Sequence, residues 1–254
     1  MRMGGAEVSC IDELAAVMDA HLRRFERDGD HRAAFLRVYR HMTLAARERL
    51  RQPFFLDPSW VERVAIRFGW YYFDALERFE QGEEPPPAWA YAFEIAARKR
   101  AFLLQDILLG MNAHINNDLP LVVAEILRAE GDDQALFKTV RRRFDHDQIN
   151  RVLHDVIPAV QDEIAHHYGR LIRPLGRLLG DLDRNLTTYG LKTWRDRVWR
   201  NARFLLAAEG DRERELVVHF IEQDALALAR EIYQFAPLRL LRPLARWMRR
   251  WRLC

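Results

Sequence analysis

The chain has little of several residue types, and each shortage removes a class of protein. Its 254 residues include two cysteines, Cys10 and Cys254, at opposite ends. This arrangement provides no disulfide framework and is typical of a reducing compartment, so we expect a cytoplasmic protein. No apolar run approaches the roughly 20 residues that cross a bilayer. Asp12 and Glu13 stand where a signal peptide needs an apolar core, so we expect no export signal.

Serine and glycine are too scarce for two common kinds of catalytic site. Ser9 and Ser59 are the only serines, and neither has the flanking glycines of a hydrolase nucleophile elbow. No glycine-rich phosphate loop is present, so no nucleotide or flavin cofactor is implied. Neither cysteine lies near a predicted base. We therefore expect no serine, thiol or nucleotide chemistry.

Positive charge is concentrated near the C-terminus. The formal net charge is +3, and residues 237–254 contain six arginines without an acid. The rest of the chain is therefore net acidic, which argues against a nucleic-acid groove across the domain. On a helix over 237–254, the leucines and tryptophans gather opposite the arginines. This pattern is typical of a helix lying on an anionic membrane surface, and equally of a last helix docking its apolar stripe on the core.

The remaining composition favours helix over strand. Glycine and proline are sparse, and 49% of the residues are hydrophobic, which is ample for a sizeable core. Apolar residues recur at helical spacing over 8–27, 31–51, 57–81, 88 to about 110, 120–129, 147–168, 194–208 and 213–235. No β-hairpin signal is present. We predict an all-α protein, with a single compact multi-helix domain over 1–236 and a basic amphipathic helix over 237–254.

Residues 110–120 concentrate the potential chemistry in the sequence Gly-Met-Asn-Ala-His-Ile-Asn-Asn-Asp-Leu-Pro. His114 and Asp118 are four residues apart, so on a continuous helix they share a face. An imidazole and a carboxylate placed in this way can bind one divalent metal ion, with zinc the first choice. His154, on the polar flank of the helix predicted over 147–168, is the third predicted ligand. His114 and Asp118 are also the first candidates for catalysis.

A purely structural interpretation of the same motif stays open. Asp118 directly precedes Leu119 and Pro120, which is the pattern of an N-cap residue followed by proline in the first turn of a helix. His114 would then bond to the carbonyl groups that end the preceding helix. A junction between two helices made in this way needs no metal.

Further residues are candidates for the same site. Tyr72 and Asp74 could move protons, although tyrosine at such a position is commonly a core residue. Asn112, Asn116 and Asn150 could bind substrate oxygens. Arg197 could bind an anionic substrate with two hydrogen bonds, or form a surface ion pair.

The central motif is accompanied by five other segments, at 35–43, 57–62, 72–75, 147–150 and 197–202. Together they resemble an uncharacterised family of bacterial helical proteins over roughly residues 8–210. This resemblance implies a helical fold and a shared pocket around 110–120, and no activity. His114, Asp118 and Pro120 are also spaced as in the motif of helical zinc phospholipases and nucleases. The histidine that those enzymes have just beyond the proline is absent, since Leu121 and Val122 stand there.

Three functions remain open from the sequence. The first is an enzyme acting on a small or lipid-like substrate around His114 and Asp118, with metal-dependent hydrolysis of an ester or phosphodiester as its most concrete form. The second is a metal-free cyclase or isomerase of an apolar substrate, with a pocket lined by Trp60, Phe68, Tyr71 and Tyr72. The third is a non-enzymatic, membrane-associated binding protein.

Overall fold

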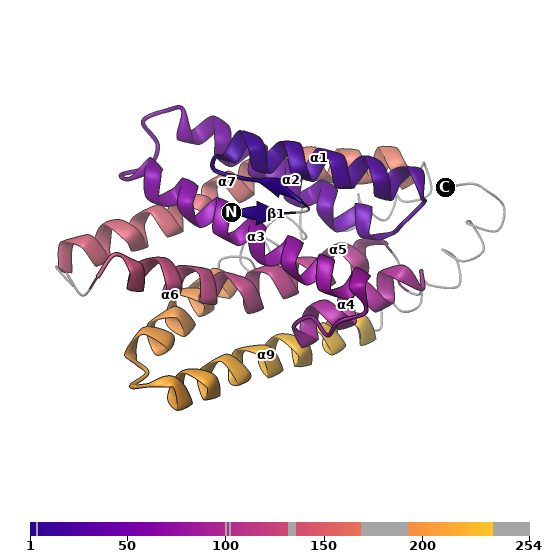
Figure 1. Ribbon diagram of the computed structural model, residues 1–254. Coiled ribbons are helices and arrows are strands. Elements are labelled where there is room, and N and C mark those ends of the chain that lie inside the picture. The colour runs from indigo at the N-terminus through magenta and orange to yellow at the C-terminus, as the bar shows by residue number, and fades with distance from the viewer. Residues whose placement is uncertain (4, 100, 102, 132–135, 169–192, 236–254) are drawn as a thin grey trace.

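Helices make up nearly all of the chain that the structure describes (Figure 1). The computed structural model describes every residue except 4, 100, 102, 132–135, 169–192 and 236–254. The elements are β1 (Arg2–Met3), β2 (Ala6–Glu7), α1 (Ile11–Arg27), α2 (Arg32–Leu50), α3 (Pro58–Gln81), α4 (Pro87–Ala97), α5 (Leu103–Asn112), the π-helix η1 (Ala113–Asp118), α6 (Leu119–Ala129), α7 (Leu136–Tyr168) and α9 (Asp211–Gln234). A further helix covers residues 193–207. The predicted all-α fold is confirmed.

The helix α3 forms where the sequence predicts it, for the predicted reasons. Asp57 precedes it, and its carboxylate accepts a hydrogen bond from the backbone N–H of Trp60 at 3.0 Å. Pro58 occupies the first turn, where its missing N–H costs nothing. Gly82 ends the helix at a φ of +77°, a left-handed conformation that a side chain would disfavour.

Three expectations about the elements are wrong. The N-terminus forms a short antiparallel hairpin in which Arg2 pairs with Glu7. Its strands have two residues each, too few for an alternating pattern to show. The helix expected from residue 88 to the motif is broken between Ala97 and Leu103, where no proline or glycine marks the break. The third error, at Pro120, bears on the site and is described below.

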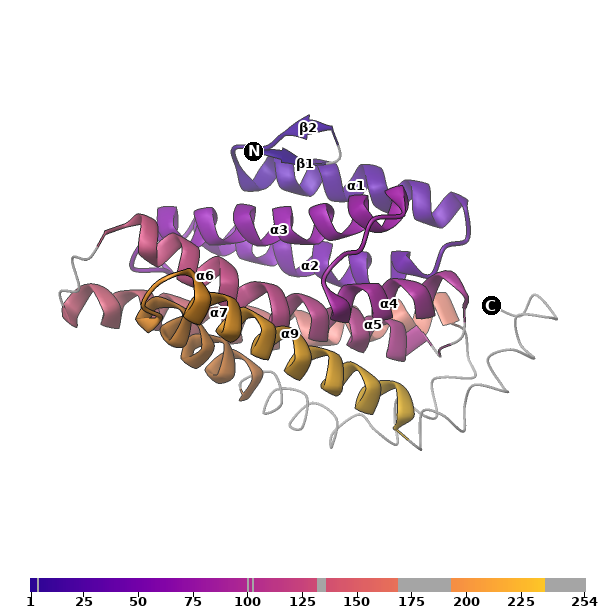
Figure 2. The ribbon, with the colours of Figure 1, turned by 60° about the horizontal axis from the view of Figure 1, so that its bottom comes forward.

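The line of α5, η1 and α6 runs through the middle of the described fold. Figure 2 shows α9 on one side of this line and α2 and α3 on the other. η1 packs against α3, α4 and α9 as well as its own neighbours along the chain. Ala113 belongs to the hydrophobic cluster formed mainly by α1 to α5, and Ile115 belongs to the cluster formed with α6, α9 and residues 193–207. The central motif is therefore at the junction of two cores.

The predicted C-terminal helix and the boundary at residue 236 lie outside the described residues. Their arrangement on the core or on lipid therefore stays a prediction. None of the helices that the structure describes has both the length and the apolar character needed to cross a bilayer.

Candidate functional site

The middle of the polar motif forms the π-helix η1, and all six residues of η1 are buried. The backbone N–H of Leu119 donates to the carbonyl of His114, five residues earlier, which is the π-helical pattern. Pro120 has no N–H, so the α-helical hydrogen bond that its position would make is missing. The chain accommodates this gap with one widened turn and continues as α6. Single π turns of this kind occur frequently at functional sites.

Asp118 does not cap a helix, so that interpretation is wrong. Its backbone is helical and its side chain makes no capping hydrogen bond, because the helix continues through it. Instead, its buried carboxylate accepts three hydrogen bonds from side chains. Trp89 Nε1 donates to Oδ2 at 2.8 Å, Asn117 Nδ2 donates to Oδ1 at 2.9 Å, and His114 Nδ1 lies 2.9 Å from Oδ2. Trp89 comes from α4, so tertiary packing completes this arrangement.

His114 is held in one protonation state and one orientation. Burial lowers the pKa of His114 below its ordinary value of 6.5, despite the opposing effect of the hydrogen bond to Asp118. The imidazole is therefore neutral at neutral pH, and the carboxylate requires the proton to be on Nδ1. Nε2 then carries a lone pair. It is buried and has no hydrogen-bond partner among the residues that the structure describes.

Aromatic rings surround this imidazole. The ring of Phe68 stacks on it with the two centroids 3.4 Å apart and an angle of 5° between the planes. Tyr39 meets it edge-on with the centroids 4.4 Å apart. The hydroxyl of Tyr39 is buried without a hydrogen-bond partner in the described part of the chain, and burial raises the pKa of this hydroxyl. A proton acceptor and a protonated hydroxyl, each without a hydrogen-bond partner in the described part of the chain, thus belong to two rings in edge-on contact.

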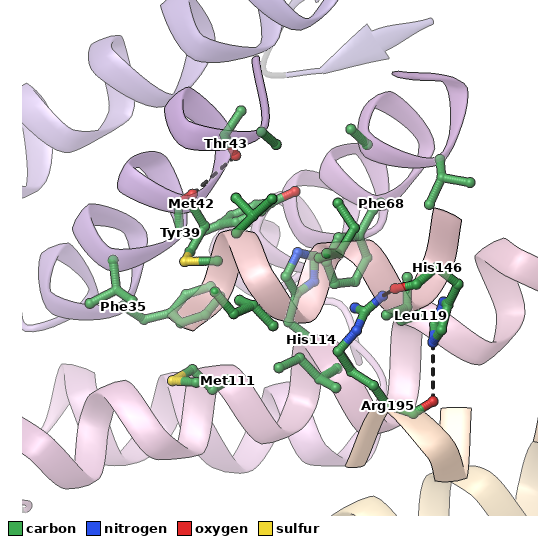
Figure 3. Close-up of a pocket in the computed structure, with 18 of the residues that line it drawn as sticks. Phe35, Tyr39, Met42, Thr43, Phe68, Met111, His114, Leu119, His146 and Arg195 are labelled. Atoms are coloured by element: carbon green, nitrogen blue, oxygen red, sulfur yellow. Dashed lines mark hydrogen bonds between the residues drawn. The ribbon is translucent and has the colours of Figure 1, made fainter. Parts of the chain in front are cut away.

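A cavity of about 280 Å³ opens beside these groups (Figure 3). Most of its lining is aliphatic or aromatic, contributed by α2, α3, α5, η1, α6 and α7. Among the described residues, its polar lining consists of Tyr39, Thr43, His114, His146 and Arg195. A mostly apolar cavity with a few converging polar groups is the usual form of a small-molecule site.

The cavity includes only part of the apolar pocket expected for a cyclase or isomerase. Trp60 and Phe68 line it, whereas Tyr71 and Tyr72 do not. Tyr72 is fully buried against Phe35, Trp89 and other rings, and burial raises its pKa. Asp74 also lies away from the cavity, and partial burial raises its pKa. Two residues apart on α3, Tyr72 and Asp74 point in different directions, so the structure does not bring this predicted pair together.

The predicted substrate-binding asparagines of the motif serve the fold. Asn112 Nδ2 donates to the carbonyl of Ala225 on α9 at 2.8 Å, and Asn116 Nδ2 donates to Asn112 Oδ1 at 3.0 Å. These bonds attach the central helix to α9. Asn150, on α7, is half-buried and does not line the cavity. Arg197 forms an ion pair with Asp224 at 2.8 Å, which was the alternative expected for it.

The three predicted metal ligands do not converge. The side chain of His154 is 54% exposed and lies 3.7 Å from the carboxylate of Asp155, away from the cavity. α7 instead turns His146, Ile149 and Leu153 toward the cavity. In addition, hydrogen bonds already occupy His114 Nδ1 and both oxygens of Asp118. Within the described ranges, no group of three or more His, Cys, Asp or Glu side chains could hold a metal ion. Among the described residues, His114, Asp118 and His154 therefore do not form the predicted zinc site.

Sequence reasoning named His114 as a site residue but not the other four polar residues of the cavity, Tyr39, Thr43, His146 and Arg195. The last two are hydrogen-bonded to each other. His146 Nε2 donates to the backbone carbonyl of Arg195 at 3.1 Å, and Arg195 Nη2 donates to the backbone carbonyl of His146 at 2.5 Å. A signal for both existed. His146 shares the helical stripe of Ile149 and Leu153, and Arg195 shares that of Val198.

The two buried histidines predict a loss of stability in mild acid. Burial lowers the pKa of both His114 and His146 below 6.5, so in mild acid the unfolded chain binds protons that the folded chain does not. The free energy of unfolding should therefore fall below about pH 6.5 by up to about 1.4 kcal/mol per pH unit for each histidine. Urea unfolding between about pH 7.5 and about pH 5 measures this slope.

Matched variants test which histidine causes this dependence of the unfolding free energy on pH. His146→Gln, which can still donate to the carbonyl of Arg195, should remove about half of this contribution. His154→Gln, at an exposed position on the same helix, should leave the slope unchanged. An identical slope in His146→Gln and the wild type would contradict the prediction.

The fold and the site define a class: an all-helical protein with a buried His–Asp pair at an apolar cavity. The chain belongs to the family of unknown function DUF5995, which matches residues 11–235. This agrees with the resemblance to an uncharacterised helical family. No curated protein and no solved structure matches the chain.

Proposed function

We propose that this protein is an enzyme that moves protons on an apolar small molecule or lipid-like substrate, as in an isomerisation or a cyclisation, with His114 as the base. One observation carries the proposal. The imidazole of His114 is neutral, its Nδ1 is bonded to Asp118, and its Nε2 has no partner within the described residues. A carboxylate that fixes the tautomer of a histidine leaves the other nitrogen ready to accept a proton.

Asp118 acts as the positioning residue in this proposal. Because Trp89 and Asn117 also donate to it, the carboxylate cannot turn away from His114 without breaking buried hydrogen bonds. When His114 accepts a proton, the adjacent carboxylate stabilises the resulting imidazolium. The energetic cost of charging a buried imidazole is thereby reduced.

Tyr39 supplies the complementary group. Burial keeps its hydroxyl protonated, so it can donate a hydrogen bond to a substrate oxygen while His114 removes a proton. The apolar lining excludes water from the reacting atoms and favours an apolar substrate. The amphipathic pattern of residues 237–254 agrees with a lipid-like substrate met at an anionic membrane surface.

Phe68 favours a second candidate, a binding protein without catalysis. Its ring covers one face of the imidazole of His114, and Nε2 itself is buried, so access to this nitrogen needs some movement of the surrounding side chains. A carrier of apolar ligands needs no access to this nitrogen. The two candidates differ in whether bound molecules exchange protons with the protein.

Deuterium incorporation separates them. The full-length protein is incubated in D₂O with an apolar extract of bacterial cells, and mass spectrometry follows deuterium uptake and product formation. We expect the rate of uptake to fall by about 10²–10⁴-fold in His114→Gln, which loses the base but can still donate to Asp118. His154→Gln, at an exposed position on α7, should match the wild type. Uptake that is absent in the wild type, or equal in His114→Gln, would contradict catalysis by His114.

A further inference from the structure

One buried positive charge that borders the cavity has no ion-pair partner among the described residues. Arg195 is 6% exposed and lines the cavity together with His114 (Figure 3). Its side chain makes one hydrogen bond to the described residues, from Nη2 to the backbone carbonyl of His146, and its buried Nε has no partner among them. Burial lowers its pKa to about 10, so the guanidinium is still charged at neutral pH.

A second buried arginine, Arg142, has the ion-pair partners that Arg195 lacks among the described residues. Arg142 is 7% exposed, and its guanidinium forms ion pairs with Asp57 at 2.6 Å and Glu130 at 3.0 Å. No carboxylate of the described residues forms an ion pair with the Arg195 guanidinium, and Asp147 and Asp196 act on it only from a greater distance. A buried charge without a counter-ion is costly, because water no longer solvates it. An anionic ligand in the cavity would supply that counter-ion.

We infer that the cavity binds a carboxylic acid with an apolar body, its carboxylate held by Arg195 and its body packed against the aliphatic lining. This inference names the substrate class of the proposed function and rests on it only in treating the cavity as the substrate site. The planar guanidinium presents parallel N–H groups that match the two oxygens of a carboxylate.

The single positive charge in the described cavity lining favours a ligand that carries one negative charge. Arg195 is the one charged side chain among the described lining residues, since His114 and His146 are neutral and no acid lines the cavity. A carboxylate balances this single charge. A phosphate monoester carries about −1.5 to −2 at neutral pH and would leave negative charge buried without a partner. With the carboxylate on Arg195, the apolar body occupies the space that His114 borders.

The test compares three ligands that share one alkyl chain. Isothermal titration calorimetry measures the binding of dodecanoate, methyl dodecanoate and dodecyl phosphate to the full-length protein. We expect the wild type to bind dodecanoate at least about tenfold more tightly than either of the other two. Arg195→Met should lose the preference over the methyl ester and still bind that ester. Arg197→Met, two residues along the same helix and ion-paired at the surface, should keep the preference.

Three results would overturn the inference: equal affinity of the wild type for dodecanoate and its methyl ester, tighter binding of dodecyl phosphate, or a preference that survives in Arg195→Met. Arg195→Lys guards against misfolding, because it keeps the charge but loses the planar fork. It should show a reduced preference that stays above that of Arg195→Met.

Calorimetry also separates this inference from the proposed function. The preference for dodecanoate over its methyl ester should depend on Arg195, whereas deuterium uptake should depend on His114. A carboxylate preference without deuterium uptake would contradict only the proposed catalysis. Uptake that depends on His114, without a carboxylate preference, would contradict only the inferred ligand.

Discussion

Replacing Asp118 with alanine is expected to lower the free energy of unfolding by about 3–5 kcal/mol. The substitution removes the acceptor for Trp89 Nε1, Asn117 Nδ2 and His114 Nδ1, all within the protein interior. A buried donor left without a partner costs about 1–3 kcal/mol, and three such donors can be only partly relieved by local rearrangement. Urea denaturation of the purified protein measures the loss.

Two further variants make this result specific. Asp118→Asn keeps the shape and one acceptor oxygen, so it should cost less than the alanine variant. Asp74→Ala removes a half-buried carboxylate that accepts no such hydrogen bond from the residues that the structure describes, and we expect a loss below about 1 kcal/mol. If Asp118→Ala were no more destabilising than Asp74→Ala, the buried network would not be a main source of stability at the junction of the two cores.

Replacing Gly110 with alanine is expected to destabilise the protein by about 1–3 kcal/mol. A Cβ atom at this position would lie 2.4 Å from Cγ and 2.8 Å from Cβ of Phe35. These atoms form the stem of a buried side chain on α2 that also lines the cavity, so the ring cannot simply turn away. The α5 and α2 helices would have to separate, which should also weaken ligand binding in the cavity.

Gly69 provides the matched control on α3. A Cβ atom there would lie 2.5 Å from Cδ1 of Leu14, which is the far end of a flexible side chain. The higher helix propensity of alanine, worth about 1 kcal/mol, can offset much of that smaller clash. Thermal or urea unfolding of both variants tests the difference. A loss in Gly69→Ala equal to that in Gly110→Ala would show that close approach to Phe35 is not the reason for glycine at position 110.

Most of the helices could be predicted from the sequence, because the spacing of apolar residues and the capping residues are local features of the chain. Apolar spacing predicts α2, α3 and α9 to within a few residues, and the cap formed by Asp57 and Pro58 predicts where α3 begins. The break between Ala97 and Leu103 could not be predicted, because this segment contains no proline or glycine. At Pro120 the local rules predicted a new helix, whereas a π turn lets the helix continue.

The spacing of four residues predicts that His114 and Asp118 share a face if the helix is continuous, and η1 provides that continuity. What the pair can do depends on tertiary packing. Trp89 on α4 holds the carboxylate, Phe68 on α3 covers the imidazole, and burial removes its charge. Tertiary packing also turned His154 outward and placed Arg195 in the cavity. Protonation, solvation and the choice of ligand depend on groups far apart in the chain, and no local pattern specifies which of them meet.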